Sequence, residues 1–283
     1  MNCNLNRPLT IKEIKNISLE GLLIFKDICE NNNLRYYLAF GTLIGAVRHS
    51  GFIPWDDDVD VLMPRWDYLK LISLTEQFKD KGWELYSYRL NQKFVMPYMK
   101  LCHKGTVVLP SRFSNGLIYG LSIDIFPLDF VSGENDADVK QLITKMKYDL
   151  IRKERRVHKT GVYSFGFNNA IKRFLKKFFY YVNIKKNKEL IKDYYNADEV
   201  LFKMSESGGT FAVYMYDKYD SVWAKKDFMG NDNEFSVVQF EGSSFTAPHN
   251  VDAVLTKTYG NYMQLPPKDK QITVHTFKAF YIG

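Results

Sequence analysis

The pattern of apolar and polar positions predicts a helix near the start of the chain. Apolar residues recur every three or four positions between residues 14 and 28, which is the spacing of one helix face. Thr10 followed by Glu13 matches a capping box and marks the helix start. Three consecutive asparagines at residues 31–33 end the pattern, so we expect an amphipathic helix over this stretch.

Short apolar or alternating runs predict strands. Arg35–Phe40 is aromatic and apolar, as a buried strand is, and it leads into Gly41. Asp58–Leu62 alternates polar and apolar residues, and Pro64 ends it. Further strands are predicted at Trp83–Tyr88, Phe94–Leu101, Leu121–Phe126, Val237–Phe240 and Ser244–Ala247.

Helices are predicted between and after these strands, which indicates an α+β fold with a mixed sheet flanked by helices. Their segments are Thr42–Arg48, Trp66–Phe78, Ala137–His158, Ile171–Tyr195 and Val251–Tyr259. We divide the chain into a catalytic core at 1–135, a basic helical insert at 136–205 and a C-terminal part at 206–283 that completes the domain.

Composition narrows the class of protein. The chain has 283 residues, of which 46% are hydrophobic and 25% charged, as in a soluble globular protein with a full core. Three widely separated cysteines exclude a disulfide framework and a cysteine metal knuckle. Neither a signal-peptide pattern nor a long apolar run is present, so we expect a cytoplasmic protein. The net charge of +7 favours an anionic partner.

The strongest chemical signal is the acidic stretch before Pro64. Asp56, Asp58 and Asp60 are two residues apart, so on a strand they project to one face. Clustered carboxylates repel one another, and a bound cation relieves that repulsion. Oxygen ligands select Mg²⁺ or Mn²⁺. The alternatives are a solvated acidic turn and a calcium loop, but the calcium loop needs glycine where Val61 stands.

Other residues complete a candidate nucleotide site. Gly41-Thr42 lies between a predicted strand and helix, where backbone N–H groups receive phosphate. Arg48 and Lys100 are candidates to neutralise phosphate, with an ordinary surface role as the alternative. Asp124 stands between isoleucines in a predicted strand, so we expect it to pair with a cation, act as a base or form a structural salt bridge.

At these residues the sequence resembles the LicD-type phosphotransferases of the nucleotidyltransferase superfamily, which include the fukutin-related proteins. The resemblance covers FGTLIGAVRHSGFIPWDDDVDVLMP at Phe40–Pro64, SIDIFPLD at Ser122–Asp129 and YGNYMQLPP at Tyr259–Pro267. It implies a nucleotidyltransferase-like fold with Gly41-Thr42 as its turn motif. It also implies Asp58 and Asp60 as a metal pair, with Asp124 and Asp56 as further acids.

The resemblance further implies transfer of phosphocholine from CDP-choline to a cell-surface glycan, with release of CMP. Such glycans include lipopolysaccharide, teichoic acid and capsule, and the acceptor can be carried on a lipid. Ribitol phosphate or glycerol phosphate are alternative groups for the same chemistry. A metal-dependent glycosyltransferase and a non-catalytic glycan-binding protein are the rivals from other classes. We expect no nucleic-acid partner.

Two further expectations concern choline and membranes. A choline ammonium needs aromatic walls, for which the candidates are Trp55, Tyr86, Tyr88, Tyr98 and Tyr119. Residues 171–181 interleave lysine and arginine with phenylalanine, a pattern suited to peripheral contact with an anionic membrane. The alternative for this segment is a solvated helix with an aromatic stripe facing the core.

Overall fold

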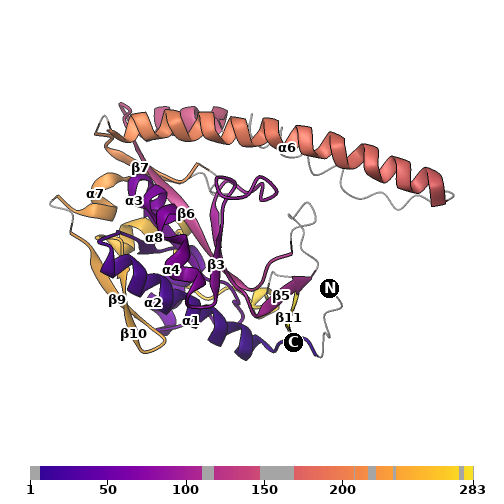
Figure 1. Cartoon of the computed structure of the whole chain (residues 1–283). Coiled ribbons are helices and arrows are strands. Elements are labelled where there is room, and N and C mark those ends of the chain that lie inside the picture. The colour runs from indigo at the N-terminus through magenta and orange to yellow at the C-terminus, as the bar shows by residue number, and fades with distance from the viewer. Residues whose placement is uncertain are drawn as a thin grey trace.

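A seven-stranded mixed sheet forms the centre of the protein in the computed structural model (Figure 1). The structure describes residues 7–109, 118–146, 169–206, 208–215, 221–231, 234–273 and 277–282, with the side chains of 169–187 outside this description. The strands of the sheet are β1 (Tyr37–Leu38), β2 (Asp60–Pro64), β6 (Ser122–Val131), β4 (Met99–His103), β3 (Trp83–Tyr86), β7 (Phe211–Val213) and β8 (Val222–Ala224).

Strand β6 is the longest strand and organises the sheet. Its first part pairs in parallel with β2 and antiparallel with β4, and its end pairs antiparallel with β7. Two small antiparallel pairs lie outside the sheet, formed by β9 (Ser236–Phe240) with β10 (Ser243–Ala247) and by β5 (Thr106–Leu109) with β11 (Lys278–Tyr281). The expected α+β class is therefore confirmed.

The two faces of the sheet differ in burial. Residues such as Val61, Ile125 and Met99 point into the main hydrophobic core and are fully buried. Helix α1 (Ile11–Asn31) packs over β4 and β6, and Thr10 and Glu13 form the expected capping box. The opposite face carries the partly exposed positions of the same strands, and it is the face that holds the polar residues described below.

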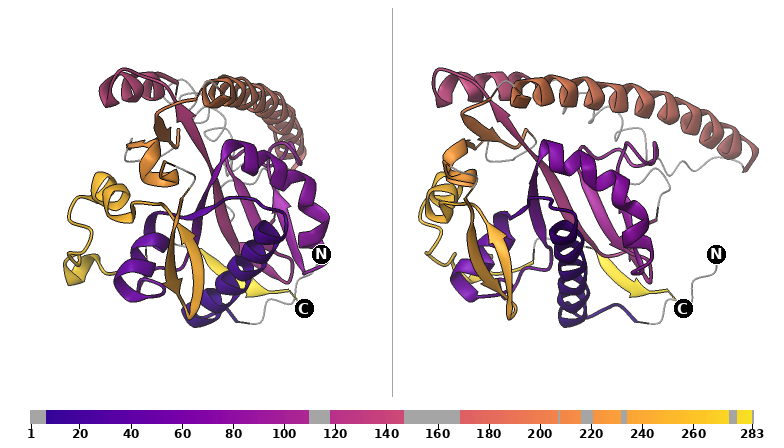
Figure 2. Two further views of the ribbon diagram at one scale, coloured as in Figure 1. Left: turned by 90° about the vertical axis from the view of Figure 1, so that its left-hand side faces the viewer. Right: turned by 60° about the vertical axis from the view of Figure 1, so that its left-hand side comes forward.

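The remaining helices surround the sheet (Figure 2). They are α2 (Phe40–His49), α3 (Arg65–Leu71), α4 (Thr75–Lys79), α7 (Lys225–Met229) and α8 (Val251–Tyr259), with 3-10 turns at Ile72–Leu74 and Lys268–Lys270 and helical residues at 136–146. Helix α6 (Asn169–Glu206) crosses above the sheet, contacts β6 and extends past the body at its first residues (Figure 1).

Several predicted boundaries were wrong. Strand β2 begins at Asp60 rather than Asp58, because the register pairing with β6 begins at Asp60, opposite Asp124. The strand predicted at Arg35–Phe40 shrinks to β1, because Phe40 opens α2. Residues Trp66–Phe78 are broken into α3, a 3-10 turn and α4. The sequence did not predict strands β5, β7, β8 and β11. Each is short, and its pairing with another strand, rather than a local pattern, determines it.

The insert is only partly described. Helix α6 is longer than the predicted Ile171–Tyr195, and of Ala137–His158 only residues up to 146 lie among those described. Residues 171–181, predicted to contact membrane, have side chains outside the described set. Within the described chain, none of the helices combines the length and the apolar character needed to span a bilayer.

Candidate active site

Three charged side chains lie in one row across neighbouring strands of the sheet. Asp60 of β2 is the register partner of Asp124 of β6, and Asp124 is the partner of Lys100 of β4. Directly paired residues on adjacent strands point to the same face, so Asp60, Asp124 and Lys100 form a charged row. Tyr86 of β3 continues it. All four are partly exposed, whereas their strand neighbours Val61 and Ile125 are buried.

Asp60 is the electrostatic centre of the charged row. Burial raises its pKa well above the ordinary value, and the carboxylates of Asp58, Asp124 and Asp56 raise it further. Lys100 opposes this shift. The four aspartates singled out from the sequence therefore act on one another. A group of carboxylates on one face favours a cation, because a cation offsets their mutual repulsion.

Asp56 and Asp58 reach this site from a loop rather than from a strand. We call residues 50–59 the acid loop. A Cβ atom at Gly41 would lie 2.6 Å from Asp56 Oδ2, so a larger residue there would displace the Asp56 carboxylate from the first turn of α2. Thr42 Oγ1 accepts a hydrogen bond of 2.9 Å from the backbone N–H of Asp60. Gly41 therefore lies beside Asp56, and Thr42 binds the backbone of Asp60, so α2 lies against the first and the last of these acids.

Two residues that sequence reasoning missed also hold the acid loop. Lys15 of α1 donates hydrogen bonds to the carbonyl oxygens of Ile53 at 2.9 Å and Pro54 at 3.0 Å. Glu241, in the turn between β9 and β10, accepts a hydrogen bond of 3.0 Å from the backbone N–H of Phe52. Neither residue carries a local sequence signal, because their partners lie 38 to 189 positions away.

Lys100 is bound into the charged row. Its ammonium donates to Asp124 and to Ser122 Oγ, and it lies 5.5 Å from the ring centre of Tyr98 and 6.0 Å from that of Tyr119. Burial is the largest effect and lowers the pKa of Lys100, but Asp124 together with Tyr119 and Cys102 outweighs it and raises this pKa above its usual value. Lys100 therefore stays positive beside the aspartates.

Arg48, the second predicted phosphate ligand, lies elsewhere. Its guanidinium donates 2.9 Å to the carbonyl oxygen of Tyr262 and 3.1 Å to Nε2 of His49. Burial lowers its pKa, and Arg48 is absent from the charges that shift Asp60. The structure thus joins Arg48 to the C-terminal segment that includes the YGNYMQLPP motif, rather than to the charged row.

The carboxylate oxygens of the charged row are ligands of the kind that Mg²⁺ or Mn²⁺ prefers. Among the described residues, no three acidic, histidine or cysteine side chains converge as a complete protein-only metal site would require. Mg²⁺ commonly takes one or two carboxylates and completes its shell with substrate phosphates and water. Asp60, its register partner Asp124 and the nearby Asp58 are the carboxylates that could hold such an ion.

The five candidates for a choline cage are dispersed. Tyr98 and Tyr119 face Lys100, and Tyr86 lies 6.3 Å from Tyr119 between ring centres while its hydroxyl donates 2.8 Å to Glu84. Trp55 packs against the main core from the acid loop. The fifth candidate, Tyr88, is buried in a separate cluster.

That separate cluster ties α6 to the sheet. Arg65, which is 1% exposed, donates two hydrogen bonds to Asp129 at 2.8 and 2.6 Å and one to Asp198 of α6 at 2.7 Å. Arg89 donates 2.7 Å to the other oxygen of Asp198, which also accepts from the Tyr88 hydroxyl. We call these five residues the buried arginine cluster. Asp129, the last residue of SIDIFPLD, belongs to it and not to the charged row.

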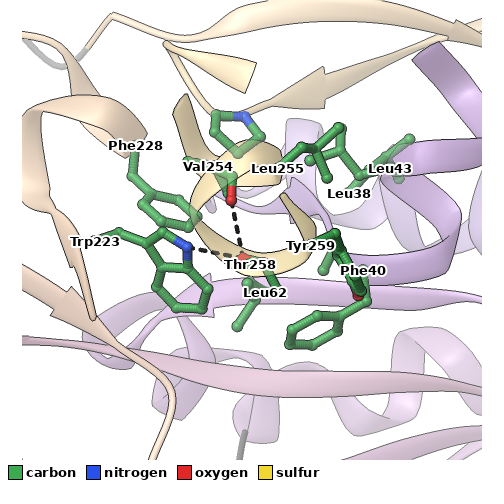
Figure 3. A pocket seen from close by; sticks show the side chains of 12 residues that line it. Leu38, Phe40, Leu43, Leu62, Trp223, Phe228, Val254, Leu255, Thr258 and Tyr259 are labelled. Carbon is green, nitrogen blue, oxygen red and sulfur yellow. Dashed lines mark hydrogen bonds between the residues drawn. The ribbon is translucent and has the colours of Figure 1, made fainter. Parts of the chain in front are cut away.

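A small apolar cavity lies beside the first turn of α2. It is lined from β1, α2, β8, α7 and α8, and Trp223 Nε1 donates 3.0 Å to Thr258 Oγ1 at its edge (Figure 3). Its volume of about 10 Å³ has room for about one water molecule. A nucleotide therefore does not fit there, and the open polar face of the sheet remains the candidate active site.

Comparison with known proteins agrees with this geometry. Residues 33–166 match the family described as LicD/FKTN/FKRP, nucleotidyltransferase domain. The chain is 27% identical to the lipopolysaccharide cholinephosphotransferase LicD of Haemophilus influenzae, across 98% of this chain and 100% of the relative. It is also 41% identical to an uncharacterized protein of Rickettsia typhi, over 26% of this chain and 25% of that one.

The matched residues 33–166 contain α2, the acid loop and the charged row, and the match to the Haemophilus protein runs through the whole fold. The family match and the similarity to the Haemophilus protein indicate a transferase of the LicD type. They confirm the resemblance to the LicD-type phosphotransferase family that was seen in the sequence.

Proposed function

We propose that this LicD-type phosphotransferase moves phosphocholine from CDP-choline to a hydroxyl of a cell-surface glycan and releases CMP. The observation that carries the proposal is the register pairing of Asp60 with Asp124, which brings two carboxylates to one open face beside Lys100. The choline specificity and a lipopolysaccharide-like acceptor rest on the relative from Haemophilus influenzae, which is similar across its full length.

The proposed reaction is a substitution at the phosphorus of phosphocholine. A bond forms from the acceptor hydroxyl oxygen to that phosphorus, and the bond from phosphorus to the phosphate oxygen of CMP breaks. Asp60 and Asp58 would hold Mg²⁺, with Asp124 either as a further ligand or as the group that accepts the hydroxyl proton. The chemistry that Mg²⁺ supplies when bound is neutralisation of charge on the donor diphosphate.

The chain's own residues orient the reactants. Lys100 keeps a positive charge at the row and suits the donor phosphates. Because Lys100 lies over the rings of Tyr98 and Tyr119, a choline ammonium placed between the same rings would meet a like charge. We therefore assign the phosphate end of the donor to Lys100. The choline end then lies toward Tyr98, whose ring packs at a tilt of 51° against Phe126, with 4.7 Å between ring centres.

The donor assignment is tested by competition among CDP-linked compounds. Purified protein is incubated with Mg²⁺, phosphocholine-free lipopolysaccharide and CDP-choline, CDP-ribitol or CDP-glycerol, and CMP release and product mass are measured. We expect CDP-choline to be used best and a chelator to stop the reaction. Preference for CDP-ribitol or CDP-glycerol would replace phosphocholine by that group, and transfer of a hexose from a nucleotide sugar would establish the rival glycosyltransferase.

Tyr98 gives a finer test of the choline end. Replacing one good cation–π partner weakens binding by about 0.5–2 kcal/mol, so Tyr98→Leu should raise the KM for CDP-choline by about 2- to 30-fold. The KM for CDP-ribitol, which lacks the ammonium, should change much less. Equal changes for both donors would contradict the assignment of Tyr98 to choline.

A further inference from the structure

The turn between β9 and β10 uses an unusual residue. Phe240 and Ser243 are register partners, so Glu241 and Gly242 form a two-residue hairpin turn, and both have positive φ, at 48° and 78°. Such turns favour asparagine, aspartate or glycine at both positions. A non-glycine residue with positive φ is uncommon. The presence of glutamate at this position therefore calls for a role of its side chain.

The Glu241 side chain is used against the acid loop. Its carboxylate accepts the hydrogen bond from the Phe52 N–H, and its own backbone N–H donates 2.9 Å to the carbonyl oxygen of Ser50. A Cβ atom at Gly51 would lie 2.3 Å from Glu241 Oε1, so a larger residue at this position would displace the Glu241 carboxylate. The turn thus binds the acid loop on both sides of Gly51.

The same part of the acid loop also packs closely against α2. The Gly51 N–H donates 3.3 Å to the carbonyl oxygen of Gly45, and a Cβ atom at Gly45 would lie 2.5 Å from the carbonyl oxygen of Gly51. The loop is therefore held between Glu241 and α2 where it begins. At its end, the hydrogen bond from the Asp60 N–H to Thr42 Oγ1 holds it to the same helix.

We propose that Glu241 is a positioning residue of the active site, which fixes the acid loop so that Asp56 and Asp58 reach Asp60. Glu241 itself acts through Phe52, four residues before Asp56, and does not touch the reactants. This proposal deepens the proposed function and uses its assay, but its structural part can be measured without any activity.

The decisive variant is Glu241→Asn. Asparagine suits positive φ, so the hairpin should keep or gain stability. Its side chain is one carbon shorter and should lose the Phe52 N–H. We expect hydrogen exchange at the Phe52 amide to accelerate at least tenfold. Because partners behind metal ligands commonly change metal affinity by about 10- to 100-fold, the Mg²⁺ concentration for half-maximal activity should rise by that factor, with the melting temperature unchanged or higher.

Two further variants serve as controls. Glu241→Gln keeps an acceptor oxygen at the same reach and should retain most of the Phe52 protection and Mg²⁺ affinity. Gln239→Ala removes a side chain of the same hairpin whose hydrogen bond goes to Ser244, 2.9 Å away, and should leave both quantities unchanged. A loss in Gln239→Ala equal to that in Glu241→Asn would assign the effect to the hairpin as a whole and overturn the proposal.

A double-mutant cycle tests the direct contact. Gly51→Ala should impair Mg²⁺ affinity in the natural background, because its methyl group meets the Glu241 carboxylate. In the Glu241→Asn background the same change should be several-fold less harmful. Additive effects would contradict the proposed contact.

The positioning role of Glu241 and the proposed function are tested by different results. An unchanged Phe52 exchange rate in Glu241→Asn would overturn the positioning role whatever the activity. If none of the CDP-linked donors is used by the natural protein, the proposed function fails. Mn²⁺ binding followed by electron paramagnetic resonance then replaces the activity assay, with weaker binding in Glu241→Asn supporting the role of Glu241 and equal binding opposing it.

Discussion

Strand β6 carries two aspartates in contrasting surroundings. Asp124 lies in the charged row on the open face, and Asp129 lies in the buried arginine cluster with no exposed surface. In the buried cluster two guanidinium groups face two carboxylates, with nitrogen–oxygen distances of 2.6 to 2.7 Å. Burial and three further carboxylates raise the pKa of Asp60, and the ammonium of Lys100 lowers it. One cluster is balanced and closed, while the other has excess negative charge and is open.

The difference separates stability from function. A buried carboxylate without a partner would cost several kcal/mol, so full pairing is expected where a cluster only joins elements. Repulsion among carboxylates on an accessible face does not stabilise the fold. A group of carboxylates in such a place is suited to binding a cation. The excess charge therefore favours the charged row as the candidate active site, and the two clusters should respond in opposite ways to the same substitution.

The largest change in stability is expected for Asp129→Asn. Removing one partner of a buried ion pair costs about 3–5 kcal/mol, because the two guanidinium groups of Arg65 and Arg89 are left with the single carboxylate of Asp198. Urea unfolding should show this loss, and the folded fraction should keep its KM for the donor. Asp27→Asn, the same change at an exposed position of α1, should be neutral. A loss below about 1 kcal/mol for Asp129→Asn would show that the buried cluster is not the structural joint described here.

Asp60→Asn is the matching change in the charged row. Loss of a group that stabilises transition-state charge lowers turnover by about 10²–10³-fold, and we expect a fall of at least this size in CMP release. Without metal, the free energy of unfolding should rise, because a raised pKa means that the folded state resists ionisation of this group. Normal turnover in this variant would remove Asp60 from the active site.

The raised pKa of Asp60 also predicts how the difference in stability between the natural protein and Asp60→Asn changes with pH. The pKa of Asp60 is raised in the folded state, so its favourable contribution is full below the unfolded pKa of about 4 and is lost as pH rises through the folded pKa. The difference in unfolding free energy between Asp60→Asn and the natural protein should therefore grow as pH rises above about 4 in the presence of a chelator. A constant difference would contradict the raised pKa.

Metal binding should stabilise the natural protein more than it stabilises Asp60→Asn. A ligand at 100 times its dissociation constant adds about 2.7 kcal/mol to the folded state. Thermal unfolding with increasing Mg²⁺ should show this gain in the natural protein and a much smaller one in the variant. Asp129→Asn should gain as much as the natural protein, because its change lies outside the charged row.

Sequence reasoning located the charged row better than the buried arginine cluster, for a physical reason. Alternation around Asp60 and Asp124 follows from each strand having one buried and one open face, which is a local pattern. Arg65 meets Asp129 and Asp198 at separations of 64 and 133 residues, and no local pattern encodes those contacts. Tyr88 accordingly remained among the candidates for choline binding, although its hydroxyl is bound to Asp198.

The start of β2 shows a second limit. The alternation of Asp58–Leu62 is real, but a strand extends only as far as its neighbours pair with it, and pairing with β6 begins at Asp60. The acids nevertheless act on one another, because Gly41 allows the acid loop to lie against α2. The composition of the site was thus readable from the chain, while the means of assembling it required the fold.

The smallest expected effect comes from Tyr88→Phe, which asks to which cluster Tyr88 belongs. A hydrogen bond to a charged group contributes about 1.5–3 kcal/mol, but Arg65 and Arg89 still pair with Asp198 in this variant, so we expect a loss near 1.5 kcal/mol. The KM for CDP-choline should stay within twofold of the natural value, because Tyr88 is 2% exposed. Urea unfolding and donor titration measure the two quantities. A raised KM with unchanged stability would return Tyr88 to the choline site and weaken the division between the two clusters.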